Sequence, residues 1–126
     1  METTRTQAAD RRVRRTDDLA LALRYLLSSQ RERAGLTHLV LATSEGILLA
    51  WDGPRDDCEE LAAYAPFIAR GEGYALDPRR LVGLSVHPFD VRDDRLYLLL
   101  RGEQPAERVA AMILSSIEGV ARILAR

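Results

Sequence analysis

The chain has 126 residues, with 18 basic and 19 acidic side chains and 47% hydrophobic residues, a composition typical of one globular domain. A single cysteine, Cys58, excludes an intramolecular disulfide and suits a reducing compartment. No apolar run approaches the roughly 20 residues that a membrane span needs. The charged N-terminus has no apolar segment of the kind found in a secretory leader. These features predict a cytoplasmic protein without membrane insertion.

The first sixteen residues differ from the rest of the chain in charge and hydrophobicity. They hold five arginines against Glu2 and Asp10 and almost no apolar side chain. We therefore expect residues 1–16 to form a disordered basic tail and residues 17–126 to form the folded domain. The arginines suit contact with an acidic partner or lipid surface, but a short basic run is more often a solubilising leader.

A helix and a β-hairpin follow the tail. Thr16 and the acidic residues after it predict a helix start, and Gly35 predicts its end. The runs 36–44 and 47–51 are rich in large apolar residues and flank Glu45-Gly46, which predicts a hairpin. Alternation places His38, Val40 and Ala42 on one face of the first strand and Leu39 and Leu41 on the other, and both faces are apolar enough to be covered.

A second helix is expected after the break at 52–54. Asp56 or Asp57, followed three residues later by an acid, resembles a capping box. Pro66 lies inside the helix and should kink or shorten it, and the glycines at 71 and 73 should end it. A shallow stripe of mostly small side chains follows one side of the helix and includes Leu61, Ala62, Ala65 and Ile68.

The second half of the chain predicts another antiparallel pair and a last helix. Segments 81–91 and 95–101 read as strands, residues 74–76 as a possible extra edge strand, and Pro105 opens a helix with a wide apolar belt. The order is α-β-β-α-β-β(-β)-α. This order predicts an α+β fold with an antiparallel sheet of four to five strands and helices on its faces.

Groups able to perform catalysis or bind a cofactor are scarce. No histidine or cysteine stands at a short metal-ligand spacing from His38 or His87, so we expect neither metal nor cofactor. At Cys58 the helix start favours the thiolate and the surrounding acids oppose it, so a packing role is expected. The net charge of −1 and the lack of an aromatic ladder argue against nucleic-acid binding.

Two features suit contact with another protein. Residues 52–60 carry five acidic side chains against Arg55, a run that suits a basic partner surface but that a solvated loop and helix cap also explain. Trp51 ends a strand beside this loop, and tryptophan is enriched among interface anchors. We take Trp51 as the candidate partner contact, with core packing as the alternative.

The segment from the first helix to the second resembles the Roadblock / dynein light-chain domain family. The resemblance rests on the leucine-rich helix ending at Gly35, the strands 39–44 and 47–50 around Glu45-Gly46, and the alanine-rich second helix. It extends over residues 17–126, although the family usually has Asp at the position of Glu45, no proline at that of Pro66, and three clear strands in the second half.

What the resemblance implies is a protein without catalytic activity of its own. It implies a cytoplasmic homodimer, of the type found in bacteria, that acts as a scaffold or regulator of a Ras-like small GTPase. In such a dimer the second helices of two copies pack together. The expected dimer interface is the small-residue stripe, whose residues are Leu61, Ala62, Ala65 and Ile68; packing of this stripe on its own sheet is the alternative.

Two other classes of function stay open. A small PAS-like or profilin-like sensory domain would hold a ligand between sheet and helices, in a cavity of about 300 Å³ or more. His38, Trp51 and His87 would have to line that cavity. A small hydrolase or transferase would depend on His38, Cys58 or His87.

Overall fold

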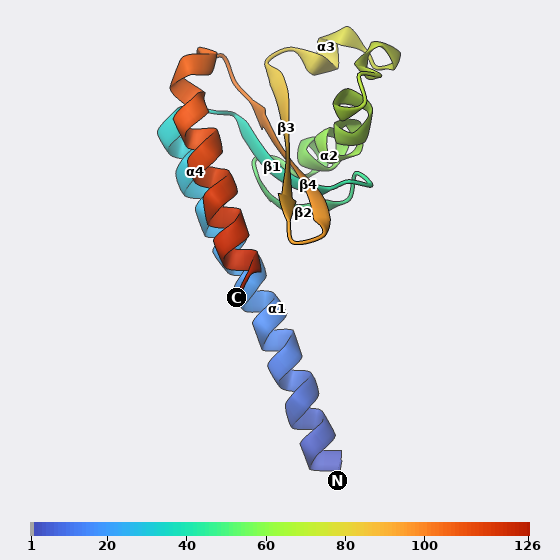
Figure 1. The fold of residues 1–126 in the computed structure, drawn as a ribbon, viewed down its shortest axis with the longest axis vertical. Helices are drawn as coiled ribbons and strands as arrows, with labels where there is room; N and C mark the ends of the chain where they lie inside the picture. The colour runs from blue at the N-terminus through green and yellow to red at the C-terminus, as the bar shows by residue number, and fades with distance from the viewer. Residues whose placement is uncertain (1) are drawn as a thin grey trace.

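The computed structural model describes the backbone of residues 2–126 and the side chains of residues 16–105 and 107–126. In these residues a four-stranded antiparallel sheet carries helices on both faces (Figure 1), which confirms the predicted α+β class. The strand order is β2-β1-β4-β3, so β2 and β3 are the edges. The elements are α1 (Glu2–Ala34), β1 (His38–Thr43), β2 (Leu48–Asp52), α2 (Arg55–Ala69), a 3-10 helix (Gly73–Ala75), α3 (Pro78–Leu81), β3 (Leu84–Val91), β4 (Asp94–Arg101) and α4 (Ala106–Leu124).

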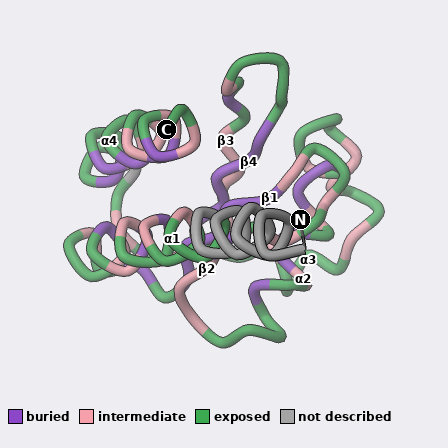
Figure 2. The backbone as a smooth tube through the Cα atoms, turned by 90° about the horizontal axis from the view of Figure 1, so that it is seen from below, coloured by how far each residue is buried: buried purple, intermediate pink, exposed green. Residues whose placement is uncertain are grey.

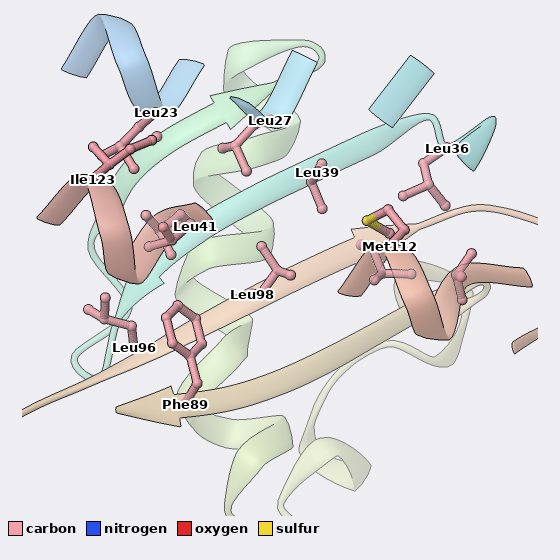
Figure 3. Close-up of a cluster of buried hydrophobic side chains, with 14 residues drawn as sticks. Leu23, Leu27, Leu36, Leu39, Leu41, Phe89, Leu96, Leu98, Met112 and Ile123 are labelled. Carbon is pink, nitrogen blue, oxygen red and sulfur yellow. The ribbon is translucent and has the colours of Figure 1, made fainter. Parts of the chain in front are cut away.

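The sheet separates two hydrophobic cores, as the alternation in β1 predicted. Leu39 and Leu41 point toward α1 and α4, where they pack in the larger core, part of which Figure 3 shows. Val40 and Ala42 point the other way and pack under α2 in the smaller core. Figure 2 shows the buried backbone gathered in the sheet and on the sides of the helices that face it. The sheet is therefore covered on each face.

The hairpin between β1 and β2 has the glycine turn that was predicted. Gly46 has a φ of 84°, and its amide donates to the Thr43 carbonyl at 3.0 Å. The Thr43 hydroxyl also accepts from the amide of Ile47 at 3.1 Å, which holds the turn. A register shift beside Leu41 and Ala42 leaves Leu49 of β2 without a partner in β1. Residues 47–52 thereby form a twisted, irregular edge of the sheet.

The first helix starts earlier than predicted. α1 begins at Glu2, whereas the sequence placed the start at Thr16. Residues 2–15 contain neither glycine nor proline, and extending an existing helix costs far less than nucleating one. The division of the chain into a tail and a domain stays a prediction, because the side chains of residues 1–15 lie outside the described residues.

The capping box predicted for the second helix is wrong. Pro54 is the N-cap of α2, with a φ of −59° and no side-chain hydrogen bond to the helix. Asp56 and Asp57 therefore lie inside the first turn, where their charge suits the helix dipole without capping it. Pro66 lies inside the helix and is buried, and α2 continues to Ala69 before Gly71 turns the chain with a φ of 78°.

The extra strand predicted at residues 74–76 is also wrong. Residues Gly73–Ala75 form a 3-10 helix, and α3 begins one residue after Asp77, whose carboxylate accepts from the Arg79 amide at 3.0 Å. Tyr74 is 87% exposed, so this segment buries no side chain that would hold it against a sheet edge. The sheet has four strands, the lower of the two numbers expected.

A candidate protein-binding surface

Trp51 lies at the end of β2, directly opposite Val40 of β1, on the α2 side of the sheet. It is half-buried and packs against the smaller core. Its ring also lies near two guanidinium groups, with Arg24 of α1 5.7 Å and Arg55 of α2 5.3 Å from the ring centroid. A guanidinium over an indole face contributes about 0.5–1 kcal/mol at an exposed site. Trp51 therefore packs in part against the core, as the alternative interpretation had it, and its role as a partner contact stays a prediction.

The surroundings of Trp51 combine an ion pair with exposed apolar surface. Asp52, the next residue, forms an ion pair with Arg31 of α1. Both side chains of this pair are partly exposed. A shallow hollow of about 300 Å³ lies beside the ring and includes Ile47, which is 57% exposed. An aromatic anchor held between two elements next to exposed apolar side chains has the features of an interface hot spot.

Most of the acidic side chains in residues 52–60 form contacts within the chain. Asp57 lies 3.3 Å from Nε2 of His38, and Glu59 pairs with Arg55 at 3.1 Å. Glu60 accepts from the Tyr64 hydroxyl and pairs with Arg80 of α3. Two of these carboxylates, those of Asp57 and Glu60, therefore join α2 to β1 and α3. The structure therefore agrees better with a solvated loop and helix start than with a surface that binds a basic partner.

Three of the four side chains proposed for the dimer interface lie inside their own subunit. Leu61, Ala62 and Ala65 are at most 2% exposed and pack in the smaller core. Ile68 is half-buried near the 3-10 helix. The alternative interpretation, that the stripe packs on its own sheet, describes these three residues. The exposed side of α2 instead carries Glu59, Ala63, Phe67 and Arg70.

The side chain of Cys58 packs in the interior of the protein, as expected from the sequence. Its side chain is fully buried in the smaller core, with Sγ 4.0 Å from the carbonyl oxygen of Asp52. Burial, together with the charges of Asp57 and Asp52, raises the pKa of the Cys58 thiol to about 11. The thiolate is the nucleophile in cysteine chemistry, so at neutral pH this thiol is protonated and unreactive.

We expect thiol labelling of Cys58 in the native protein to be slow. A disulfide exchange reagent at pH 8 should react roughly a hundredfold or more slowly with the folded chain than with the chain in denaturant, because the thiol is reached only when the structure opens. A Val82→Cys variant is the control, since Val82 is 72% exposed. Equal rates for folded and unfolded Cys58 would contradict the placement.

The histidines lie on opposite faces of the sheet and do not converge with Trp51. His38 contacts Thr37 and Asp57 on the α2 side. His87 of β3 contacts the Ser85 hydroxyl at 3.0 Å and lines a groove of about 440 Å³ between β3 and α4. Burial lowers the pKa of His87, so it is neutral at pH 7. The three residues expected to line a single ligand cavity are not brought together.

Within the described residues, no cluster of three or more His, Cys, Asp or Glu side chains is arranged to hold a metal ion. The same part of the chain contains no helix with the length and hydrophobicity of a membrane span. The surface that remains as a candidate site consists of Trp51 with its two arginines and the exposed side of α2.

Neither a family model nor a curated protein matches the chain. Solved structures do match it. The gliding protein MglB of Thermus thermophilus has a TM-score of 0.60 at 17% identity, over 83% of this chain and 90% of that one. A structure of MglB in a tetrameric arrangement gives the same TM-score and identity over 83% and 89%. A Roadblock/LC7 domain from Streptomyces avermitillis has a TM-score of 0.53 at 19% identity, over 76% and 95%.

The chain has the Roadblock/LC7 fold. The resemblance drawn from the first helix, the hairpin and the second helix is thereby confirmed at the level of fold. The edges of the sheet are β2 and β3. The helices α1 and α4 cover one face of the sheet, and α2 covers the other. In this chain, the surface around Trp51 lies where α1, β2 and α2 meet.

Proposed function

We propose that this protein is a non-catalytic, homodimeric cytoplasmic scaffold that binds a Ras-like small GTPase, or another protein, and modulates its nucleotide cycle or location. The observation that carries the proposal is the likeness in fold to MglB structures over 83% of the chain. The inert Cys58 and the separated histidines agree with a role in binding rather than in chemistry. The polarity and motility functions of bacteria are the expected context.

The proposed partner contact centres on Trp51. Its indole lies near the guanidinium groups of Arg24 and Arg55 and packs against the smaller core, so little side-chain entropy is lost when a partner covers it. Arg55 also pairs with Glu59, so the surroundings of the ring hold charges of both signs, which suits a partner surface with polar groups around an apolar pocket.

The proposed self-contact uses the second helix, as expected from the sequence, but on its exposed side. Ala63 and the 40%-exposed Phe67 form a small apolar centre. Glu59 and Arg70 flank this centre but pair within the chain with Arg55 and Glu72, so the proposed self-contact rests on the apolar side chains. Ile68 is the one residue of the original interface that still has surface to contribute there. The MglB structure in a tetrameric arrangement supports self-association in general.

A pull-down with a small GTPase from the same genome, loaded with GDP or with a GTP analogue, tests the partner. We expect binding that depends on the nucleotide, and we expect Trp51→Ala to weaken it roughly tenfold or more, because a central aromatic anchor is lost. Tyr74→Ala is the matched control, since Tyr74 is 87% exposed and lies away from β2. Circular dichroism melting of both variants separates lost contact from lost stability.

Absence of binding in both nucleotide states would overturn the GTPase proposal. Equal binding by the Trp51→Ala and Tyr74→Ala variants would overturn the assignment of the surface while leaving the partner in place. A particle of 14.1 kDa, the mass of one chain, across the micromolar range would overturn the homodimer.

The sensory-domain alternative is favoured by one observation, the groove of about 440 Å³ beside His87. Its lining is mainly apolar, and Ser85 and His87 already bond to each other. A ligand there would find few polar groups free to orient it, so we place this function second. Titrating the protein in solution with a small apolar probe, and following the NMR chemical shifts of His87, would test this function.

A further inference from the structure

An open hollow of about 620 Å³, here named the turn hollow, lies between the two hairpin turns of the sheet and the end of α4. Its apolar surface comes from Leu49 of β2, which is 40% exposed, and from the half-buried Val91 and Leu124. The turns between β1 and β2 and between β3 and β4 supply the charged side chains of its rim. These side chains are Glu45, Arg92, Asp93, Asp94 and Arg95. The turn hollow thus places apolar surface next to charge.

The rim of the turn hollow carries more negative than positive charge. Arg95 pairs with Asp90 at 2.6 Å, and Arg92 donates a hydrogen bond to the carbonyl of Ala125 at 3.3 Å. The three acidic side chains of the rim are exposed and, within the described residues, form no ion pair. With Asp90 counted beside its partner, the acidic side chains exceed the guanidinium groups by two. An occupant with positive charge is therefore favoured.

Arginine is the side chain whose chemistry fits the turn hollow. Its methylene stem covers apolar surface while its head stays in polar surroundings, and its guanidinium binds a carboxylate through two parallel hydrogen bonds. A single arginine would gain little here, because an exposed ion pair contributes about 1 kcal/mol or less. Several arginines on one preorganised element lose less freedom on binding than separate ones. The fitting occupant is therefore a helix with an arginine-rich side.

The chain itself contains such a helix in residues 2–15 of α1, here named the arm. The arm holds five arginines against Glu2 and Asp10, a net charge of +3. By the 3.6-residue period of a helix, all five arginine positions fall on one half of α1 and both acidic positions on the other. The five arginines are Arg5, Arg11, Arg12, Arg14 and Arg15. The arm therefore has the charge and the one-sided pattern that the turn hollow favours.

The arm does not occupy the turn hollow of its own chain. α1 is one helix from Glu2 to Ala34, and residues 2–15 contain neither glycine nor proline to bend it back. None of the described side chains of α1 lines the turn hollow. In Figure 1 the arm runs on beyond the end of the sheet at which the turn between β3 and β4 lies. The arm and the turn hollow are thus presented at the same end of the molecule.

We propose that the turn hollow binds the arm of a second copy of this chain, and that two copies exchange arms about a two-fold axis. The symmetry makes the contact twice, once for each arm, and closes the pair. A second copy is the occupant because this chain carries the complementary charge at the end where the turn hollow opens. The arm exchange is separate from the α2 contact under Proposed function, since no residue that lines the turn hollow belongs to α2.

Sedimentation equilibrium of the full chain tests the proposal, with Phe67→Glu present throughout to remove the α2 contact. A rim variant, Asp93→Arg with Asp94→Arg, should associate roughly tenfold or more weakly, because the arm then meets like charge. The matched control is Glu103→Arg with Glu107→Arg, which changes the net charge equally at exposed acids outside the turn hollow. An unchanged constant for the rim variant, or an equal loss in the control, overturns the proposal. Circular dichroism melting checks that each variant is folded.

A charge exchange tests whether the arm is what binds the rim. An arm variant, Arg11→Glu with Arg12→Glu, should lose association as the rim variant does. A chain that combines the arm and rim changes should regain most of the association, because opposite charges face each other again. An equimolar mixture of the arm variant and the rim variant should associate more strongly than either alone, since the intact arm of one chain meets the intact rim of the other. Additive losses in the combined chain would overturn the pairing.

The single changes distinguish the arm exchange from the α2 contact. Phe67→Glu alone should leave pairs joined through their arms, and the rim changes alone should leave pairs joined through α2. Monomers from Phe67→Glu alone overturn the arm exchange, leave the α2 contact in place and leave the turn hollow to a basic segment of another protein. Monomers from the rim changes alone overturn the α2 contact and leave the arm exchange in place, so failure of one proposal is not mistaken for failure of the other.

Discussion

Replacing Leu99 with alanine should destabilise the folded state by about 2–5 kcal/mol. Leu99 lies in β4 between Val40 and Val86 and is fully buried beneath α2. Alanine removes three heavy atoms from a site closed in by two neighbouring strands and a helix, so the cavity collapses only in part. A loss of this size is a large fraction of the stability of an ordinary domain, which is about 5–15 kcal/mol.

Urea unfolding followed by circular dichroism measures this loss, with Leu21→Ala as the matched control. Leu21 is 53% exposed on α1, so the same truncation there should change the free energy of unfolding by less than about 1 kcal/mol. A similar effect at both positions would mean that the smaller core does not hold α2 in the way the structure shows. Because α2 carries Arg55 and the exposed Phe67, loss of this core should also weaken partner binding.

Replacing Gly46 with alanine should destabilise the protein by about 2–4 kcal/mol, which combines two effects. Its φ of 84° is unfavourable for a residue with a Cβ atom. A Cβ atom there would also lie 3.2 Å from the carbonyl oxygen of Ala62 and 3.3 Å from both Cα of Ala63 and Cγ of Pro66. The hairpin turn is thus packed against the backbone of α2, and a methyl group must push the two apart.

The chain offers a control that separates backbone strain from packing. Gly71 has a φ of 78°, and a Cβ atom added there would have no neighbour within 4 Å. Gly71→Ala should therefore show the strain alone, about 1–2 kcal/mol, and the difference between the two variants measures the contact between turn and helix. Equal losses of unfolding free energy for Gly46→Ala and Gly71→Ala, measured by thermal or urea unfolding, would show that the turn does not pack against α2.

The Gly46 contact also matters for the candidate binding surface. The turn leads into β2, whose last residues are Trp51 and Asp52, and α2 supplies Arg55, whose guanidinium lies 5.3 Å from the centroid of the indole ring. A shift of the turn against α2 would change the gap in which Trp51 is held. We therefore expect variants of Gly46 to weaken partner binding even under conditions where they remain folded.

Much of the architecture follows from local sequence patterns. The alternation in β1 predicted which side chains enter each core, and Gly35, Gly46 and Gly71 marked the ends of elements correctly. These signals work because they depend on the period of a strand or on the backbone freedom of glycine, both of which are properties of a few neighbouring residues. The same reasoning failed at residues 74–76, where short sequence cues resembled a strand but the chain forms a 3-10 helix with no buried residue.

The candidate site was less predictable, because its parts come together from distant segments. Arg24 and Arg55 lie on different helices, and nothing in the local sequence around Trp51 indicates that both reach its ring. The pairing of Arg31 with Asp52 joins residues 21 positions apart in the chain. Contacts of this kind depend on how α1 and α2 lie across the sheet.

By itself, the sequence determined the class of the fold, the order of its elements and the residues that share a face. Only the tertiary structure decided what covers each face. Leu61, Ala62 and Ala65 of α2 face their own sheet, whereas Leu114 of α4 is 62% exposed. The physical reason is that periodicity along a helix records which side chains point together, while their burial depends on which distant surface lies opposite them.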